Sequence, residues 1–528
     1  MKDYTKKQKI LIVLGVSLFI LIGSGLTYAA LTWATNPINI GLTSGCFEIN
    51  YTPGGAINNA NVEVMNESTL INNNKFTITD GIALTYANIG IKSTCKIEGY
   101  GSLYLNVTNL SNAFSTGSSK GSLKYAILNN TSTSTNLTVA GLKGQSFDIV
   151  KKGTITSTGT INILNKQLSN TVQNKYLIVF YIDGSLIGND VVGASFAGNI
   201  SADAHQGEIP YEGLAKLIAK DTFKSTKTVP LNSVNYKYDE NHNLMEDVAG
   251  NIRYYGANPN NYIYFNCSDY SNQTSSTCET WRIIGVFDKK VKIMRGSSIG
   301  TYSWDSSASD VNSGNGVNEW SQADLMKLLN SGYDSESIGG SLYWNAKSGT
   351  CYDGSKNATK SCNFTSTGLK NDTTRNMIAE TTYYTRGDWD GSIYVDAMYD
   401  KERVSGTVVN ATPPRTLTWT GKIAIPYPSD YGYAADLSLC QQKLNYYSDA
   451  TCTANNWMKS ILAPNYGWLL TPDSVRVYYA LNVSSSGDVY GYVASRSNGI
   501  APVLSLSSEL DIGPGTGESS SPYQLSVN

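Results

Sequence analysis

The chain has 528 residues, more than one compact domain usually holds, and its charges nearly balance, with 40 Lys plus Arg against 42 Asp plus Glu. A net charge of −2 excludes the broad positive field of a nucleic-acid-binding protein. The 36 tyrosines and 48 glycines are typical of a β-rich surface protein, and the 2 histidines leave little for histidine catalysis or metal ligation.

The N-terminus joins a lysine cluster to a long uncharged stretch. Residues 1–9 are rich in lysine, and residues 10–35 carry no charged side chain. Because about 20 apolar residues span a bilayer as a helix, we expect a transmembrane helix at 10–35, a cytoplasmic segment at 1–9 and an exported remainder. The Thr27-Tyr28-Ala29 sequence before Ala30 also fits a cleavage site, so a removed signal peptide is the alternative.

An even number of cysteines in an exported chain predicts disulfides. There are 8 cysteines, and the last six form three pairs of near neighbours. The expected disulfides therefore join near neighbours: Cys46–Cys95, Cys267–Cys278, Cys351–Cys362 and Cys440–Cys452. A zinc site is the weaker alternative, because the sequence has no CxxC and no histidine near these cysteines.

Residues 36–201 contain short alternating runs, such as KFTITDGIALTYANIGI and YLIVFYI, separated by clusters of Gly, Asn and Ser. This pattern predicts an all-β sandwich of antiparallel strands, which we interpret as a membrane-proximal stalk. Its one GxSxG string, at Gly117–Gly121, is expected to be a loop, because no apolar strand leads into it. Residues 202–247 are expected to be a linker, with one short amphipathic helix at Tyr211–Lys220.

From about Val248 the chain becomes rich in tryptophan and cysteine, which favours a loop-rich α+β domain over 248–528. Strands are expected at Trp281–Phe287 and Lys290–Arg295, joined by an Asp288-Lys289 turn, and in GKIAIPY and APVLSL further along. Ser321 and Asp324 resemble a capping box before an apolar helix face that includes Leu325 and Leu329. Weaker helices are expected at 373–382, 434–447 and 455–462.

Several motifs occur in a fixed order in this half: GNIRYYGANPNNYIYFN, WRIIGVF, GVNEWSQADLMKLLNSGY, GGSLYWN, WTGKIAIPYPSDYGYA and the closing GPGTGESSSPY. Through them 248–528 resembles an uncharacterised bacterial extracellular domain. The resemblance implies a C-type-lectin-like fold, akin to that of formylglycine-generating enzymes and of the kind targeted by diversity-generating retroelements. The chain departs from that family at Ala501, where an arginine commonly precedes the proline. More faintly, GCFEINYT and IKSTCKI resemble anchored camelysin-like β-sandwich domains, without the HExxH of a peptidase.

The candidate site lies between Trp468 and Pro502, where a strand, a Ser484–Gly487 turn and a second strand are expected. Tyrosine and arginine give contact area and hydrogen bonds at modest entropic cost, as in antibody paratopes. The candidate ligand-binding residues are Arg476, Tyr478, Tyr479, Tyr490, Tyr492, Arg496 and Asn498. The resemblance implies variable binding residues in such a segment. The alternative is that these tyrosines face solvent or pack beneath the strands.

Other conspicuous residues have structural interpretations. We expect Trp281 to pack in the core and Asp430 to cap a helix at Ala434. Asp388 and Asp390 carry ligands suited to Ca²⁺, but a solvated loop is the better interpretation. Cys440 and Cys452 are the only candidates for the reactive pair of a formylglycine-generating enzyme, and their spacing indicates a disulfide instead. We therefore expect no catalytic residue, no metal and no cofactor.

These observations predict a single-pass cell-membrane protein with its bulk outside the cell. Its expected function is adhesion, or binding of an extracellular protein or glycan, with no nucleic-acid partner. A structural envelope or fibre component is the alternative, and a formylglycine-generating-type enzyme is a distant third.

Overall fold

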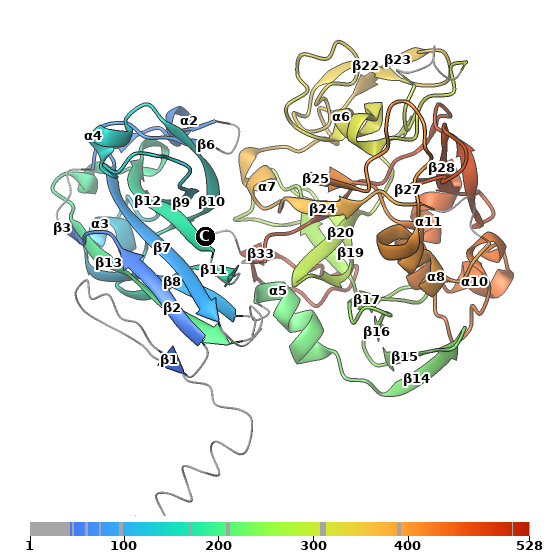
Figure 1. The fold of residues 1–528 in the computed structure, drawn as a ribbon, viewed down its shortest axis with the longest axis horizontal. Coiled ribbons are helices and arrows are strands. Elements are labelled where there is room, and N and C mark those ends of the chain that lie inside the picture. Colours follow the sequence, from blue (N-terminus) through green and yellow to red (C-terminus); the bar gives the residue numbers. More distant parts are fainter. Residues whose placement is uncertain are drawn as a thin grey trace, which may run out of the picture. The chain divides into compact units, whose positions relative to one another are not determined.

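The structure is a computed structural model. It describes residues 43–44, 47–58, 62–72, 75–93, 99–168, 172–206, 212–306, 313–387, 392–508 and 510–526. The fold is mostly β-strands in several sheets, with few and short helices (Figure 1). The chain divides into two compact units, Met1–Pro210 and Tyr211–Val527. The predicted anchor at 10–35 lies outside the described residues, and no helix that the structure describes is long and apolar enough to cross a membrane.

The first unit is built from two sheets. The larger runs in the order β1 (Thr43–Ser44), β2 (Phe47–Pro53), β7 (Ala83–Ser93), β12 (Gln173–Asp183), β9 (Leu123–Asn129), β10 (Ser146–Thr154), β6 (Lys75–Thr77) and β5 (Ile71–Asn72), with β4 (Val64–Met65) beside β12. The smaller runs β11 (Gly159–Leu168), β8 (Gly99–Leu110), β13 (Phe196–Gln206) and β3 (Ile57–Asn58). Two sheets around one core fit the predicted β-sandwich.

Strand β12 explains why the two sheets pack together. Side chains alternate between the faces of a strand, and β12 is apolar at both sets of positions. Ile178 and Phe180 enter the core shared with the smaller sheet, whereas Leu177 and Val179 enter a second core on the opposite face. The short helices of this unit are α2 (Glu67–Leu70), α3 (Asn112–Ser115) and α4 (Val139–Leu142). The Gly117–Gly121 string follows α3 as turns, as expected for a loop.

The second unit is organised around a nine-stranded antiparallel sheet. Its order is β14 (Lys227–Leu231), β15 (Val234–Asp239), β16 (Leu244–Glu246), β17 (Ile252–Tyr254), β19 (Glu279–Phe287), β20 (Lys290–Arg295), β31 (Val503–Ser505) and β26 (Ile423–Ala424), with β18 (Tyr262–Phe265) beside β19. The predicted strands at 281–287 and 290–295 are therefore confirmed as β19 and β20. Asp288 and Lys289 both have positive φ, as a tight hairpin turn requires.

This sheet is buried on both faces and separates two hydrophobic cores. Ile283 of β19 and Ile293 of β20 face one core, and their neighbours Ile284 and Met294 face the other. Trp281 is fully buried in the first core, as expected. A strand buried on both faces is a near-continuous apolar run, which is why WRIIGVF was recognisable as a strand.

Smaller sheets and helices surround the central sheet. The three-stranded sheet contains β27 (Trp468–Pro472), β28 (Tyr479–Val483) and β29 (Val489–Val493). The two-stranded pairs are β21 (Thr301–Tyr302) with β30 (Asn498–Gly499), β22 (Ser348–Tyr352) with β23 (Thr359–Asn363), β24 (Thr381–Tyr384) with β25 (Thr418–Gly421), and β32 (Asp511–Ile512) with β33 (Leu525–Ser526). The α-helices are α5 (Gly213–Lys216), α6 (Asp324–Leu329), α7 (Asp372–Asn376), α8 (Val395–Asp400), α9 (Pro428–Tyr433), α10 (Ala450–Ala454) and α11 (Lys459–Leu462).

Three of the four predicted disulfides are confirmed in the second unit: Cys267–Cys278, Cys351–Cys362 and Cys440–Cys452. In the chain-entropy model, closing loops of 11 or 12 residues stabilises a fold by roughly 2–3 kcal/mol each. Cys46 and Cys95 lie outside the described residues, and their pairing stays a prediction.

The predicted linker at 202–247 is wrong over most of its length. Residues 202–206 continue β13 in the first unit, and 227–246 form β14, β15 and β16 of the central sheet in the second. The expected amphipathic helix is present in shorter form as α5 and a following turn of π-helix, Leu217–Thr222, with Leu214 and Ile218 buried. The strands β14, β15 and β16 are rich in polar residues because only some of their side chains are buried, and this composition resembles that of a linker.

The predicted helices are shorter than expected. Asp324 begins α6, but the capping box with Ser321 does not form, because Ser321 donates to Glu319 and Asp324 accepts the Ser306 N–H. The helix expected at 434–447 is wrong: α9 ends at Tyr433, and Asp436 then accepts the N–H and hydroxyl of Ser438. Such side-chain to backbone bonds compete with helical ones. The helices expected at 373–382 and 455–462 are present only as the short helices α7 and α11.

Candidate functional site

The predicted strand, turn and strand before Pro502 are confirmed as the hairpin β28–β29, and β28 is labelled in Figure 1. The hydroxyl of Ser484 accepts the N–H groups of Gly487 and Asp488, which closes the turn. Tyr431 of α9 donates to the Gly487 carbonyl at 2.8 Å. The turn is therefore fixed both by its own side chains and by the core helix beneath it.

The two faces of the hairpin have different environments. Leu481, Val483 and Val489 are fully buried in the core that also contains α9. Tyr490 and Tyr492 lie opposite Asn482 and Ala480 in the strand register and are half-buried. Because alternate residues of a strand share a face, both tyrosines belong to the same side of the hairpin. They therefore combine an anchored backbone with partly accessible rings.

The hairpin tyrosines and arginines form two contiguous clusters. In the first, the Tyr478 and Tyr479 ring centroids are 5.3 Å apart, and the Arg476 guanidinium lies 4.0 Å from the Tyr479 centroid. In the second, the Tyr490 and Tyr492 centroids are 6.2 Å apart, and Arg496 lies 4.3 Å from that of Tyr492. Six of the seven predicted residues are thus brought together in two clusters on one hairpin.

Asn498, the seventh, is placed differently. It is fully buried in β30, opposite Tyr302. Its side-chain amide has no hydrogen-bond partner within the described part of the chain. Because no atom of its amide is accessible, Asn498 is not part of the surface that the six other residues form.

Arg476 is held by a buried carboxylate. Asp473 is fully buried and lies 2.7 Å from the Arg476 Nε, while its other oxygen accepts the N–H groups of Val475 and Arg476. A charge-assisted contact to a buried partner fixes the arginine more firmly than a surface ion pair would. Arg476 therefore serves as a brace that orients the ring of Tyr479.

Asn318 and Arg415 hold the segment that enters the hairpin. The Asn318 side-chain nitrogen lies within 3.0 Å of the carbonyl oxygens of Asp473, Arg476 and Tyr479. Arg415 donates to the Asn318 side chain and to the Val477 carbonyl. These contacts join parts of the chain more than 60 residues apart in sequence. The hairpin base is therefore held by a long-range polar clamp.

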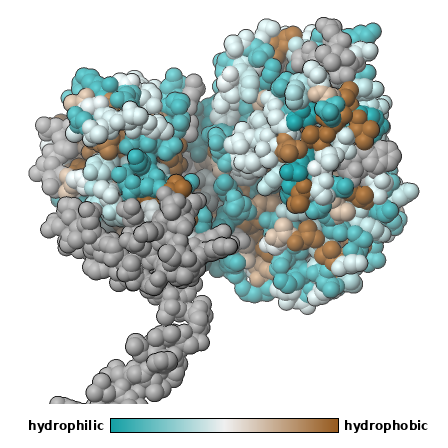
Figure 2. Space-filling view, in the orientation of Figure 1, coloured by the Kyte–Doolittle hydropathy of each residue, from teal (hydrophilic) through white to brown (hydrophobic). Residues whose placement is uncertain are grey.

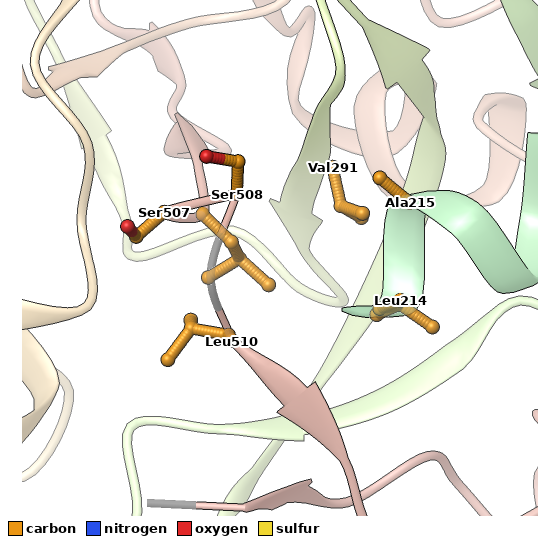
Figure 3. A pocket seen from close by; sticks show the side chains of 7 residues that line it. Leu214, Ala215, Val291, Ser507, Ser508 and Leu510 are labelled. Atoms are coloured by element: carbon orange, nitrogen blue, oxygen red, sulfur yellow. The ribbon is translucent and has the colours of Figure 1, made fainter. Parts of the chain in front are cut away.

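A polar crevice of about 230 Å³ adjoins this clamp. Its walls include Val317 and Glu319, the two neighbours of Asn318, together with Lys327 and Pro413. A second crevice lies under α5, where Leu214 and Ala215 face Val291 and Leu510 (Figure 3). The second crevice is apolar and leaves no room for a bound molecule. Of the two, only the polar crevice offers space next to the hairpin.

A separate group of charged residues is buried inside the second unit. Asp430 accepts from Arg253 at 3.0 Å and is also paired with Lys292, and all three side chains are almost inaccessible. Burial alone would raise the pKa of Asp430, but the charges of Lys292, Arg253 and Arg403 outweigh it and lower the pKa to about 2. Asp430 also accepts the Tyr427 N–H at 3.0 Å, so it caps the start of α9 from within that helix, and not the helix predicted from Ala434. We assign this group to stability because it is closed to solvent.

The visible surface of both units is mostly hydrophilic, with apolar residues in small patches (Figure 2). Within the described ranges, no group of three or more His, Cys, Asp or Glu residues is arranged to hold a metal ion. Asp388 and Asp390 lie outside those ranges. The Cys440 and Cys452 sulfurs are joined to each other.

No protein-family model matches the chain. No curated protein matches it either. The function must therefore be argued from the geometry of the hairpin and its surroundings.

Sequence reasoning missed Tyr466, Asn318 and Asp473, which complete this site. Tyr466 precedes the segment that the tyrosine pattern marked out, and its ring centroid lies 5.1 Å from the Arg496 guanidinium. Asn318 stands inside the GVNEWSQADL motif, but nothing in that motif indicates a contact with residues 473–479. Only the folded structure brings these positions together.

Proposed function

We propose that this chain is a cell-surface adhesion or ligand-binding protein that captures an extracellular ligand with the β28–β29 hairpin. The observation that carries the proposal is the pair of tyrosine–arginine clusters on an anchored hairpin. Tyrosine and arginine are enriched where interfaces gain most of their binding energy, and a fixed backbone lowers the entropy lost on binding. The adjoining polar crevice gives a ligand depth as well as area.

We further propose that the second unit has a C-type-lectin-like fold and that the protein is anchored by a membrane helix at 10–35. Three disulfides support an oxidising location outside the cytosol. The uncharged N-terminal stretch behind a lysine cluster supports the anchor. In this arrangement the first unit is a stalk and the second presents the hairpin to its ligand, an extracellular protein or glycan.

The test replaces four hairpin tyrosines together: Tyr478→Ala, Tyr479→Ala, Tyr490→Ala and Tyr492→Ala. The full chain and this variant are applied to an array of immobilised glycans and extracellular proteins. We expect the variant to lose at least tenfold in affinity for whatever the parent captures, because the contact area is removed while the buried Leu481, Val483 and Val489 are kept.

Tyr446→Ala is the matched control, since that tyrosine is exposed but lies outside the hairpin. The double variant Tyr490→Ala with Tyr492→Ala is measured as well, so that binding can be assessed if the fourfold variant is unstable. Circular dichroism and melting temperature report the fold. Unchanged capture by both hairpin variants would reject the proposed function.

A further inference from the structure

The guanidinium of Arg496 has no hydrogen bond or ion pair with any residue that the structure describes. Its contacts are with two rings, at 4.3 Å from the Tyr492 centroid and 5.1 Å from the Tyr466 centroid. Every other arginine in the described ranges donates at least one hydrogen bond: Arg253, Arg282, Arg295, Arg375, Arg386, Arg403, Arg415 and Arg476. Arg496 is therefore the arginine whose donors are left for a partner outside the chain.

The two rings hold Arg496 in place without using its N–H groups. A cation over an aromatic face is attracted to the ring, and the N–H groups of a guanidinium point outward in its own plane. Those groups form a planar fork that matches two oxygens of a carboxylate or sulfate. An arginine positioned in this way loses little entropy when it binds such a group.

Tyr466 supplies a second, independent observation. Its backbone has a φ of +53°, in the left-handed region that bulky side chains rarely adopt, and it is the one aromatic residue in the described ranges with a positive φ. A glycine would adopt this φ without strain, but the chain has a tyrosine at this position. Ser485 of the hairpin turn donates to the Tyr466 hydroxyl at 3.2 Å. Tyr466 ends the short 3-10 helix Ala463–Asn465 in this conformation, and its ring lies beside Arg496.

The surroundings of Arg496 are rich in hydroxyl groups. Tyr466, Tyr490 and Tyr492 cluster around it, and Ser485 and Ser486 are exposed at the tip of the hairpin. Burial raises the pKa of Tyr490, and the charge of Arg496 opposes that rise, which agrees with their proximity. One free guanidinium among neutral hydroxyls suits a unit with one anionic group and many hydroxyls. An acidic peptide, with a charge on successive residues, would call for several cations.

We propose that Arg496, held between Tyr466 and Tyr492, binds the carboxylate or sulfate group of a sugar in an anionic polysaccharide. This inference rests on the proposed function, because it names the ligand class of the same hairpin. The guanidinium fork binds the anionic oxygens, and the hydroxyls of the neighbouring tyrosines and serines bind those of the sugar.

The test measures binding of the full chain to four immobilised polymers: polygalacturonate for carboxylate, dextran sulfate for sulfate, uncharged dextran and polyglutamate. We expect binding to polygalacturonate or dextran sulfate that weakens with added salt. Arg496→Gln should weaken it about tenfold or more, since a charge-assisted pair is lost. The affinity of Arg496→Lys should lie between those of the parent and of Arg496→Gln, because lysine keeps the charge but lacks the planar fork of N–H groups.

Lys443→Gln is the matched control. It removes one positive charge from a lysine that also lies over a tyrosine ring, that of Tyr394, and should bind like the parent. Arg496→Gln should keep the parent melting temperature, because the Arg496 guanidinium makes no hydrogen bond within the described chain, and the backbone bond to Val493 is kept.

Equal binding by Arg496→Gln and the parent, tighter binding to polyglutamate or to uncharged dextran, or no binding to either charged polysaccharide would each overturn the inference. If the tyrosine variants lose their ligand while Arg496→Gln keeps it, the proposed function stands and the anionic-sugar assignment fails. If the tyrosine variants also keep their ligand, the proposed function and the anionic-sugar assignment both fail.

Discussion

At the scale of single residues, Asp430 takes part both in a local helix cap and in ion pairs with distant residues. Its position among turn-forming residues predicts a capping role, and it does accept the Tyr427 N–H, but at the start of α9 and not of a helix at Ala434. No sequence pattern indicates that Arg253 and Lys292 contact Asp430, because they lie 177 and 138 residues away. Capping is a local property, whereas a buried ion pair depends on how distant strands are arranged.

Asp430→Asn should lower the free energy of unfolding by about 3–5 kcal/mol, because it leaves the buried Lys292 without a carboxylate and Arg253 paired with Asp247 alone. Urea unfolding followed by circular dichroism measures this loss. Asp372→Asn is the control: that carboxylate is also paired with an arginine but is exposed, so its loss should cost less than about 1 kcal/mol. Equal effects of the two substitutions would show that the buried pair does not stabilise the fold.

The lowered pKa of Asp430 also predicts an acid dependence. Its pKa is about 2 in the folded chain against an ordinary value of 3.8, so the unfolded chain binds the proton first as pH falls. The contribution is complete above about pH 4 and is lost as pH falls through 2, with a total of roughly 2 kcal/mol. Stability measured from pH 6 to pH 2 should therefore fall less steeply in Asp430→Asn than in the parent. Parallel curves would contradict this.

At the scale of elements, strands were predictable where their pattern is local, and helices were not. The hairpin around Ser484–Gly487 and the pair β19–β20 were found from alternating or continuous apolar runs beside turn residues. The helix expected at 434–447 failed because Asp436 bonds to Ser438, and the disulfide Cys440–Cys452 holds irregular chain in place. Helices of four to six residues are too short for helical periodicity to mark them.

The clamp at the base of the hairpin provides a prediction at this scale. Asn318→Ala removes the side chain that bonds to three carbonyls of residues 473–479, and should lower the free energy of unfolding by about 1–3 kcal/mol. Hydrogen exchange should also become faster at 473–479 but not at β22–β23, a distant hairpin that serves as the internal control. Unchanged exchange at 473–479 would show that Asn318 does not hold this segment.

At the scale of the whole molecule, the second unit begins at Tyr211, well before the change of composition near Val248 that predicted its start. Residues 227–246 lack a strong apolar run, but Val229, Leu231, Tyr236 and Tyr238 are buried in the core on one face of the central sheet. The sequence could mark a change of composition near Val248, but it could not show that β16 pairs with β17 across that point. Strand pairing, rather than composition, sets the limit of this unit.

Separate fragments test this boundary. A fragment of 211–527 retains α5 and β14–β16, and should unfold in one cooperative thermal transition. A fragment of 248–528 removes them and exposes the apolar side chains that they cover, so it should melt at a lower temperature or aggregate. Differential scanning calorimetry compares the two, and equal melting temperatures would refute the assignment of 211–247 to the second unit.

The division of labour within the hairpin has a consequence for engineering and for evolution. Leu481, Val483 and Val489 are buried in one core and Tyr492 packs against the other, whereas the half-buried Tyr478 and Tyr490 belong to neither core. Substitutions at Tyr478 and Tyr490 should therefore change the binding surface with little effect on the melting temperature. A randomised library confined to the codons of Tyr478 and Tyr490 should remain largely well folded, and selection from it should yield binders for targets unrelated to the original one.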